Sequence, residues 1–212
     1  MIVALLVATI RLQRPPAEDV LKLVVNHYQK LKSFTTKISH HADFLTDVKN
    51  STDELKWLAP KRFELTSDHE SIPKLICDGR HLTTFIPNIA PISESFNNDS
   101  GRTKPWETRG GLLLSILMHG TMAEQLLHPE KSVKIKFDHG SVIHWHDLSV
   151  SQIIETITVH NVSEQITYYL SPNYQKLIGT EITNGTDTSW TQYDDQLENI
   201  DLPKTLGSLA DH

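Results

Sequence analysis

The sequence predicts an α+β fold in which antiparallel strands form most of the chain and two apolar helical segments pack against them. Three observations support this class. From residue 34 onward, most segments are rich in β-branched and aromatic residues that alternate with polar ones, as half-buried strands do. Residues 18–32 instead carry apolar residues at helical spacing. Residues 111–127 are apolar on more than one helical face, which is typical of a buried helix.

Length and composition favour a single globular domain over residues 17–212. The 212 residues are 38% hydrophobic and 22% charged, and no linker-like stretch divides them. The formal net charge of −6, without a dense Lys/Arg cluster, argues against a nucleic-acid partner. Cys77 is the single cysteine, so the sequence offers no disulfide framework and no cysteine-based metal motif. We expect a monomer without a cofactor.

The first ten residues, MIVALLVATI, have two interpretations. The run is shorter than the ~20 residues that a transmembrane helix needs, but it suits the apolar region of an export signal. A basic start and a clear A-x-A cleavage site are both lacking. Residues 1–16 are therefore interpreted as a truncated export signal or leader, with a buried first strand as the alternative.

The next segment, residues 18–32, is predicted to be an amphipathic helix. It opens with Glu18 and Asp19 and closes with Lys30 and Lys32, a charge order that complements the helix dipole. Strands are expected at Thr35–Phe44, on both sides of Pro60 (Leu55 with Trp57, then Phe63 with Leu65), and at Lys74–Cys77, His81–Ile86 and Ile89–Ser95. Asp78-Gly79 predicts a type I′ hairpin turn.

After a loop at Asn97–Lys104, the apolar segment 111–127 is expected to be divided at Gly120 and to stop at Pro129. A meander of strands follows it. The strands are expected at Val133–Phe137, Val142–Leu148, Ile153–Val159, Gln165–Leu170, Leu177–Ile182 and Thr188–Tyr193, with turns at Asp138–Gly140, Asn161, Ser171–Asn173 and Asn184-Gly185.

The order of these elements, with several local phrases, resembles a known family. The phrases are DVLKLVVNHYQKLKSF, WLAPKRFELT, CDGRHLTTF, YYLSPNYQKLIGTEI and LPKTL, which together span nearly the whole chain after residue 17. They are similar to phrases in the bacterial lipoprotein carriers of the LolA and LolB type and in the N-terminal domain of RseB-type regulators. The match is closer to carrier-like relatives of LolA than to LolA itself.

This resemblance implies a strongly curved antiparallel sheet, an incomplete barrel, with helices on or in its concave side. It implies a periplasmic or otherwise exported protein of the bacterial envelope that binds a lipid or a lipidated protein. A cavity in the concave side would then hold an acyl chain. Its expected lining residues are Trp57, Phe63, Phe85, Leu113, Leu117, Met118 and Met122. In the alternative interpretations these residues form an ordinary core, or the protein is an interaction or sensor module that uses residues 111–127 as its interface.

Other chemistry has weaker support in the sequence. His144 and His146 would share one face of a strand and could chelate a metal if His139 or His160 completed the site. The competing interpretation is a solvated strand face with Trp145 turned into the core. Motifs of nucleophilic catalysis and nucleotide binding are missing. We therefore expect a protein that is not an enzyme, with a hydrolase as the least favoured hypothesis.

Overall fold

The protein is represented by a computed structural model that describes residues 14–42, 50–96, 104–128, 133–159, 162–185 and 187–207. Within these ranges three helices accompany eleven strands. The helices are α1 (Ala17–Tyr28), α2 (Pro105–Met118) and α3 (Thr121–Leu127). The strands are β1 (Ser33–Ala42), β2 (Asn50–Leu58), β3 (Arg62–Ser67), β4 (Lys74–Cys77), β5 (His81–Phe85), β6 (Ile92–Ser95), β7 (Lys134–Trp145), β8 (Leu148–Val159), β9 (Val162–Leu170), β10 (Leu177–Asn184) and β11 (Asp187–Glu198).

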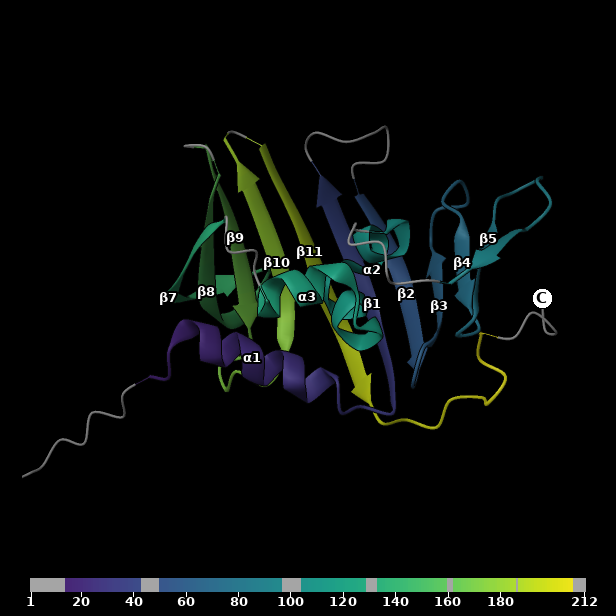
Figure 1. The fold of residues 1–212 in the computed structure, drawn as a ribbon, viewed down its shortest axis with the longest axis horizontal. Coiled ribbons are helices and arrows are strands. Elements are labelled where there is room, and N and C mark those ends of the chain that lie inside the picture. Colours follow the sequence, from purple (N-terminus) through teal and green to yellow (C-terminus); the bar gives the residue numbers. More distant parts are fainter. Residues whose placement is uncertain are drawn as a thin grey trace, which may run out of the picture.

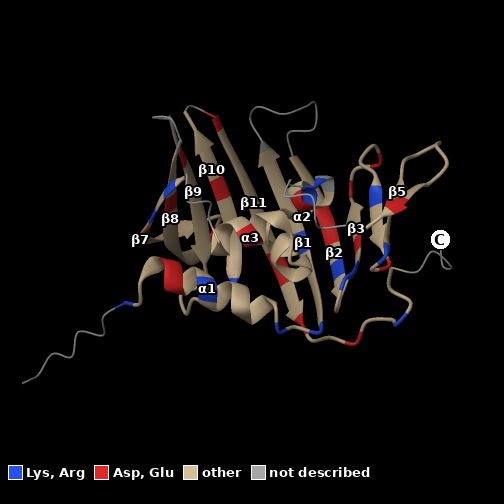
Figure 2. Cartoon of the chain, in the orientation of Figure 1, with Lys and Arg blue, Asp and Glu red and all other residues tan. Residues whose placement is uncertain are grey.

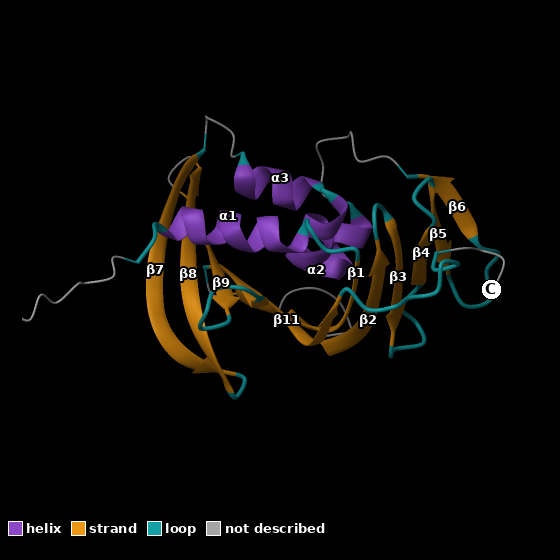
Figure 3. Ribbon diagram, turned by 90° about the horizontal axis from the view of Figure 1, so that it is seen from below, coloured by secondary structure: helices purple, strands orange, loops and turns teal. Residues whose placement is uncertain are grey.

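All eleven strands belong to one antiparallel sheet in the order β6-β5-β4-β3-β2-β1-β11-β10-β9-β8-β7. The first strand of the chain pairs with the last one, and β6 and β7 form the two open edges. The sheet curves around the helices, which lie together inside its concave face (Figures 1 and 3). The predicted α+β class, with a strongly curved and unclosed sheet, is therefore confirmed.

Helix α1 buries the apolar face that the sequence predicts, but it is shorter than predicted. Val20, Val24 and Tyr28 are at most 2% exposed. The helix ends at Tyr28, and the amides of Lys30 and Leu31 bond to carbonyls three residues back, which forms a tight turn in place of another helical turn. Leu31 therefore stays in the core although it lies beyond the helix.

The β4–β5 connection is the predicted hairpin with a different turn. Asp78 and His81 face each other across the loop, so Gly79 and Arg80 are its central residues. Gly79 has a φ of +95°, whereas Arg80 does not have a positive φ. Glycine at the first central position is the pattern of a type II′ turn, and the predicted type I′ turn is wrong.

The largest correction concerns β7. The sequence predicted two strands separated by a turn at Asp138–Gly140, but β7 runs unbroken through this segment with a bulge between His139 and Val142. The chain turns later, at His146 and Asp147, which both have positive φ and so form a type I′ turn. Bulges and turns favour the same residues, so the Asp-His-Gly cluster is compatible with either.

The helical insert begins earlier than predicted. Helix α2 starts at Pro105, a residue with no amide proton to satisfy, and continues through Gly111 to Met118. Gly120 separates it from α3, as predicted. Some predicted features lie outside the described residues and are not tested, namely those at residues 1–13, 43–49, 97–103, 129–132 and 160–161. No described helix is long and apolar enough to cross a membrane.

Candidate ligand-binding cavity

A cavity of about 400 Å³ lies inside the concave face, between the helices and strands β7 to β10. This volume is at the lower end of the range of about 300–1,000 Å³ that ligand pockets occupy. The lining is predominantly apolar. It consists of Leu112, Met122, Gln125, Leu126, Val133, Ile135, Glu155, Ile157, Ile166, Tyr168, Thr180 and Ile182.

Strand alternation supplies the wall of the cavity. On β8, β9 and β10 every second side chain points to the concave face, and the lining residues follow that spacing. Cross-strand pairing brings them together, because Ile166 lies opposite Glu155 on one side and Ile182 on the other. Ile135 on β7 pairs with Ile157 on β8. The result is a patch of branched aliphatic side chains on neighbouring strands.

Helix α3 supplies the opposite side. Met122, Gln125 and Leu126 are spaced by three and four residues, so they share one face of the helix. Leu126 is 8% exposed, whereas Met122 is partly buried and Gln125 is exposed. Gln125 therefore lies where the cavity meets solvent.

A buried carboxylate fixes α2 and α3 relative to each other. Glu107 is fully buried, and its Oε2 accepts a hydrogen bond of 2.9 Å from the Lys104 amide at the start of α2. Its Oε1 accepts from the Ser115 hydroxyl at 2.8 Å and from the Met122 amide at 3.0 Å, in the first turn of α3. One side chain thus caps both helices, so the position of α3 over the cavity does not depend on apolar packing alone.

Gly111 allows α2 to bend where it meets the sheet. Its φ of +62° interrupts the helix, and a Cβ at this position would overlap the Tyr193 hydroxyl. That hydroxyl accepts a hydrogen bond of 3.3 Å from the Leu113 amide, just after the interruption. The bend places Leu112 at the cavity, while Leu113 points into the core.

The first turns of α2 are also held by a buried ion pair. Asp53 on β2 is 1% exposed, and Arg109 Nη2 donates to its Oδ1 at 2.6 Å. Arg109 donates as well to the carbonyl of Pro73. His40 Nε2 lies 3.6 Å from Asp53 Oδ2, which is too long for a good hydrogen bond but close enough for a charge interaction. Burial opposes ionisation of Asp53, yet His40 and Arg109 outweigh it and lower its pKa.

The cavity wall contains one polar pair among its aliphatic side chains. Glu155 and Tyr168 are 3% and 4% exposed, and the Tyr168 hydroxyl donates a hydrogen bond to Glu155 Oε2. Burial raises the pKa of Glu155 above its ordinary value, against the opposing effect of this hydrogen bond. Burial likewise raises the pKa of Tyr168 well above its ordinary value. The pair therefore places a carboxyl group in a site of low polarity.

Of the seven residues predicted to line a cavity, Met122 does so. Trp57, Phe63, Leu113, Leu117 and Met118 are at most 3% exposed and belong to the hydrophobic core. Phe85 is half-buried on β5, near the β6 edge of the sheet and away from the cavity. Helix α2 packs over β2 and β3, where Trp106 contacts Phe63, whereas the open space lies between α3 and strands β7 to β10.

The sequence contained one signal for the true wall. Ile153, Glu155 and Ile157 alternate along β8, and a glutamate among residues of an apolar face is unusual. The structure puts Ile153 in the core and the other two at the cavity. The same pattern occurs on β2, where Asp53 alternates with Leu55 and Trp57 in the core, so this signal alone does not distinguish the cavity wall from a filled face.

The histidine hypothesis is wrong in its geometry. His146 lies in the β7–β8 turn rather than on the strand, and its ring centroid is 4.5 Å from that of Trp190. Trp145 is buried, but in a second cluster on the outer face of the sheet, where it stacks on Tyr169. In the described part of the chain no three His, Cys, Asp or Glu side chains form a group that could hold a metal.

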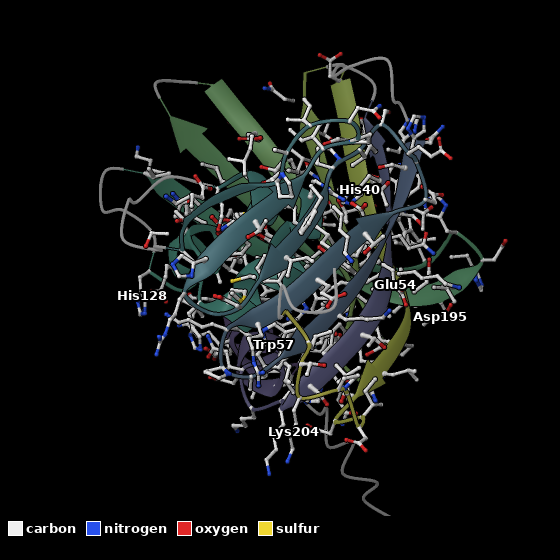
Figure 4. The ribbon with its side chains drawn as sticks, turned by 90° about the vertical axis from the view of Figure 1, so that its right-hand side faces the viewer. His40, Glu54, Trp57, His128, Asp195 and Lys204 are labelled. Carbon is white, nitrogen blue, oxygen red and sulfur yellow. The ribbon has the colours of Figure 1, made fainter. Side chains whose placement is uncertain are left out.

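A second depression, on the surface, is polar and basic. It lies between the end of α1, the adjoining ends of β1 to β3 and residues 199–204. Lys30, Lys32, Arg62 and Lys204 line it together with Asp201. Figure 2 shows basic residues along this edge of the molecule, and Figure 4 shows Lys204 at its lower end.

Comparison with known proteins identifies relatives by structure only. No protein-family model matches the chain, and no curated protein matches it. The lipoprotein LppX from Mycobacterium tuberculosis is similar at a TM-score of 0.52, with 8% identity over 88% of this chain and 97% of LppX. The MucA/MucB complex from Pseudomonas aeruginosa contains a chain that is similar at 0.50, with 10% identity over 92% of this chain and 61% of that one.

A LolA superfamily protein from Nitrosomonas europaea is similar at a TM-score of 0.41, with 11% identity over 91% of this chain and 98% of that one. At identities this low the similarity concerns the fold alone. The similarity to LppX and to the chain of the MucA/MucB complex confirms the predicted resemblance to the lipoprotein-carrier fold as a resemblance of fold.

Proposed function

We propose that the protein binds the hydrocarbon chain of a lipid, or of a lipidated protein, in the cavity between α3 and strands β7 to β10. The observation that carries this proposal is a predominantly apolar cavity of about 400 Å³, lined by Ile135, Ile157, Ile166 and Ile182 with Met122 opposite. Burial of each methylene contributes about 0.8 kcal/mol, so about ten methylenes would supply about 8 kcal/mol before the costs of binding.

The proposed role is binding without chemistry. Among the described lining residues, Glu155 and Tyr168 are the ionisable ones, and they are hydrogen-bonded to each other. A nucleophile held by a base would require a different arrangement. Support for a place in the bacterial envelope comes from LppX, a protein named as a lipoprotein that shares this fold. We propose the same setting for this chain.

The alternative, an interaction module, has partial support. The similarity to a chain of the MucA/MucB complex shows that this fold occurs in a protein assembly. Part of the expected interface, residues from Leu112 to Met118, is at most 6% exposed and belongs to the core. Within the same segment Glu124 and Gln125 on α3 are exposed, so a protein partner could contact α3 but not the apolar part of α2.

The proposal is tested by filling the cavity. I166W places an indole among the lining side chains, whereas I154W makes the same change on β8 but on the other face of the sheet. Binding of the neutral apolar dye N-phenyl-1-naphthylamine is measured by fluorescence titration. We expect I166W to weaken binding at least tenfold and I154W to change it less than twofold, with both variants folded by circular dichroism.

Equal dye binding by wild type and folded I166W would refute the assignment of the cavity. A complementary measurement is mass spectrometry of solvent extracts from the purified protein. A bound lipid should be present in the wild type and depleted in I166W, and its retention in I166W would again contradict the proposal.

A further inference from the structure

The polar pair in the cavity wall has a chemical preference that an apolar cavity alone would lack. We propose that the cavity selects an apolar chain that carries a hydroxyl group over the same chain ending in a free carboxylate. This inference rests on the proposed function, and it names the class of ligand that the site would take.

The pair consists of Glu155 and Tyr168, which come from neighbouring strands and are both nearly inaccessible from outside. The Tyr168 hydroxyl has a single proton, and that proton is engaged by Glu155 Oε2. What the pair can still offer to a bound molecule is therefore acceptor capacity, from the carboxylate and from the lone pairs of the Tyr168 oxygen.

The negative charge of Glu155 also favours a ligand hydroxyl over a ligand carboxylate. The described residues that line the cavity include no Lys and no Arg, so Glu155 has no cation beside it in this space. A ligand carboxylate would meet a second carboxylate at low polarity, which is unfavourable. A ligand hydroxyl would instead donate a hydrogen bond to the charged group, and such charge-assisted bonds are among the stronger ones.

The other polar lining groups do not reverse this preference. Thr180 lies opposite Tyr168 on β10, and its hydroxyl can donate or accept. Gln125 is exposed at the solvent side of the cavity. Neither group carries a positive charge. The raised pKa of Glu155 has the same origin, because burial without a compensating cation disfavours its charged form.

The experiment compares three ligands of equal chain length at pH 8: 1-dodecanol, dodecanoate and 1-methoxydodecane. Each displaces N-phenyl-1-naphthylamine from the wild-type protein. We expect dodecanol to bind at least tenfold more tightly than dodecanoate, which is charged, and than the methyl ether, which has no proton to donate. Binding of all three within threefold of one another would overturn the inference and leave the proposed function intact.

Variants assign the preference to the pair. E155Q removes the charge and adds an amide donor, so the ratio of dodecanol to dodecanoate affinity should fall at least fivefold. The matched control is E181Q, the same change on the opposite face of the sheet, where Glu181 interacts with Tyr169. An E155Q ratio equal to that of E181Q would refute the assignment.

A third variant, Y168F, tests the role of Glu155 independently if E155Q fails to fold. Y168F removes the internal donor to Glu155 and leaves the carboxylate dependent on the ligand, so the preference for dodecanol should rise. If Y168F bound dodecanol no more tightly than it binds 1-methoxydodecane, the role of Glu155 would be contradicted. If neither dye nor any of the three ligands bound the wild type, the proposed function itself would fail.

Discussion

Breaking the buried pair between Asp53 and Arg109 should cost a large part of the stability of the fold. Asp53 is 1% exposed, and Arg109 links it to α2 through a contact of 2.6 Å. R109M removes the cation and leaves the carboxylate buried, with His40 Nε2 3.6 Å from its Oδ2. Removing one partner of a buried pair typically costs about 3–5 kcal/mol.

Urea denaturation at pH 7 measures this cost. The control is R80M, the same substitution at an exposed position in the β4–β5 loop, which should change the free energy of unfolding by less than about 0.5 kcal/mol. The double variant D53N/R109M should recover about 1–3 kcal/mol relative to R109M, because it no longer buries an uncompensated charge. A loss below about 1 kcal/mol in R109M would contradict the buried-pair argument.

The pH dependence gives an independent check. The pKa of Asp53 lies below its ordinary value of 3.8, so its ionised form stabilises the folded state above pH 3.8. This contribution is lost as the pH falls through the lower, folded-state pKa. The stability difference between wild type and R109M should therefore narrow when the pH decreases below 3.8. A difference that stays constant from pH 7 to pH 3 would show that Arg109 acts through packing instead of charge.

Two further predictions concern the cavity and the outer face of the sheet. Burial raises the pKa of Glu155 above its ordinary value of 4.5. The folded protein therefore loses stability as the pH rises from 4.5 through the raised pKa. The melting temperature of E155Q, measured relative to the wild type, should increase from pH 4 to pH 8. A constant difference would contradict the raised pKa. G179A should destabilise by about 1–3 kcal/mol and shift tryptophan fluorescence, because a Cβ there would overlap the Trp145 ring and lie 2.6 Å from the Thr191 carbonyl oxygen. A loss below about 0.5 kcal/mol would show that Trp145 can move aside.

Much of the fold could be predicted because its signals are local. The alternation of β-branched residues predicts the positions of ten of the strands along the chain, and the acids at 18 and 19 predict the start of α1. The β7 error has a physical cause. A bulge and a turn both favour small and polar residues, and only the cross-strand partner, Ser151 opposite Val142, distinguishes them.

The cavity was harder to predict than the fold because its position depends on what fills the rest of the trough. An apolar residue on the concave face lines open space only where no helix packs on it, and nothing in the spacing of Phe63 or Ile166 distinguishes these outcomes. The bend at Gly111 and the double cap by Glu107 decide where α2 ends and where α3 begins. These two residues keep α2 over β2 and β3 and hold α3 opposite β7 to β10, so the cavity lies between α3 and these strands. The position and size of the cavity are therefore set by polar and conformational features of the helical insert as much as by the aliphatic side chains that line it.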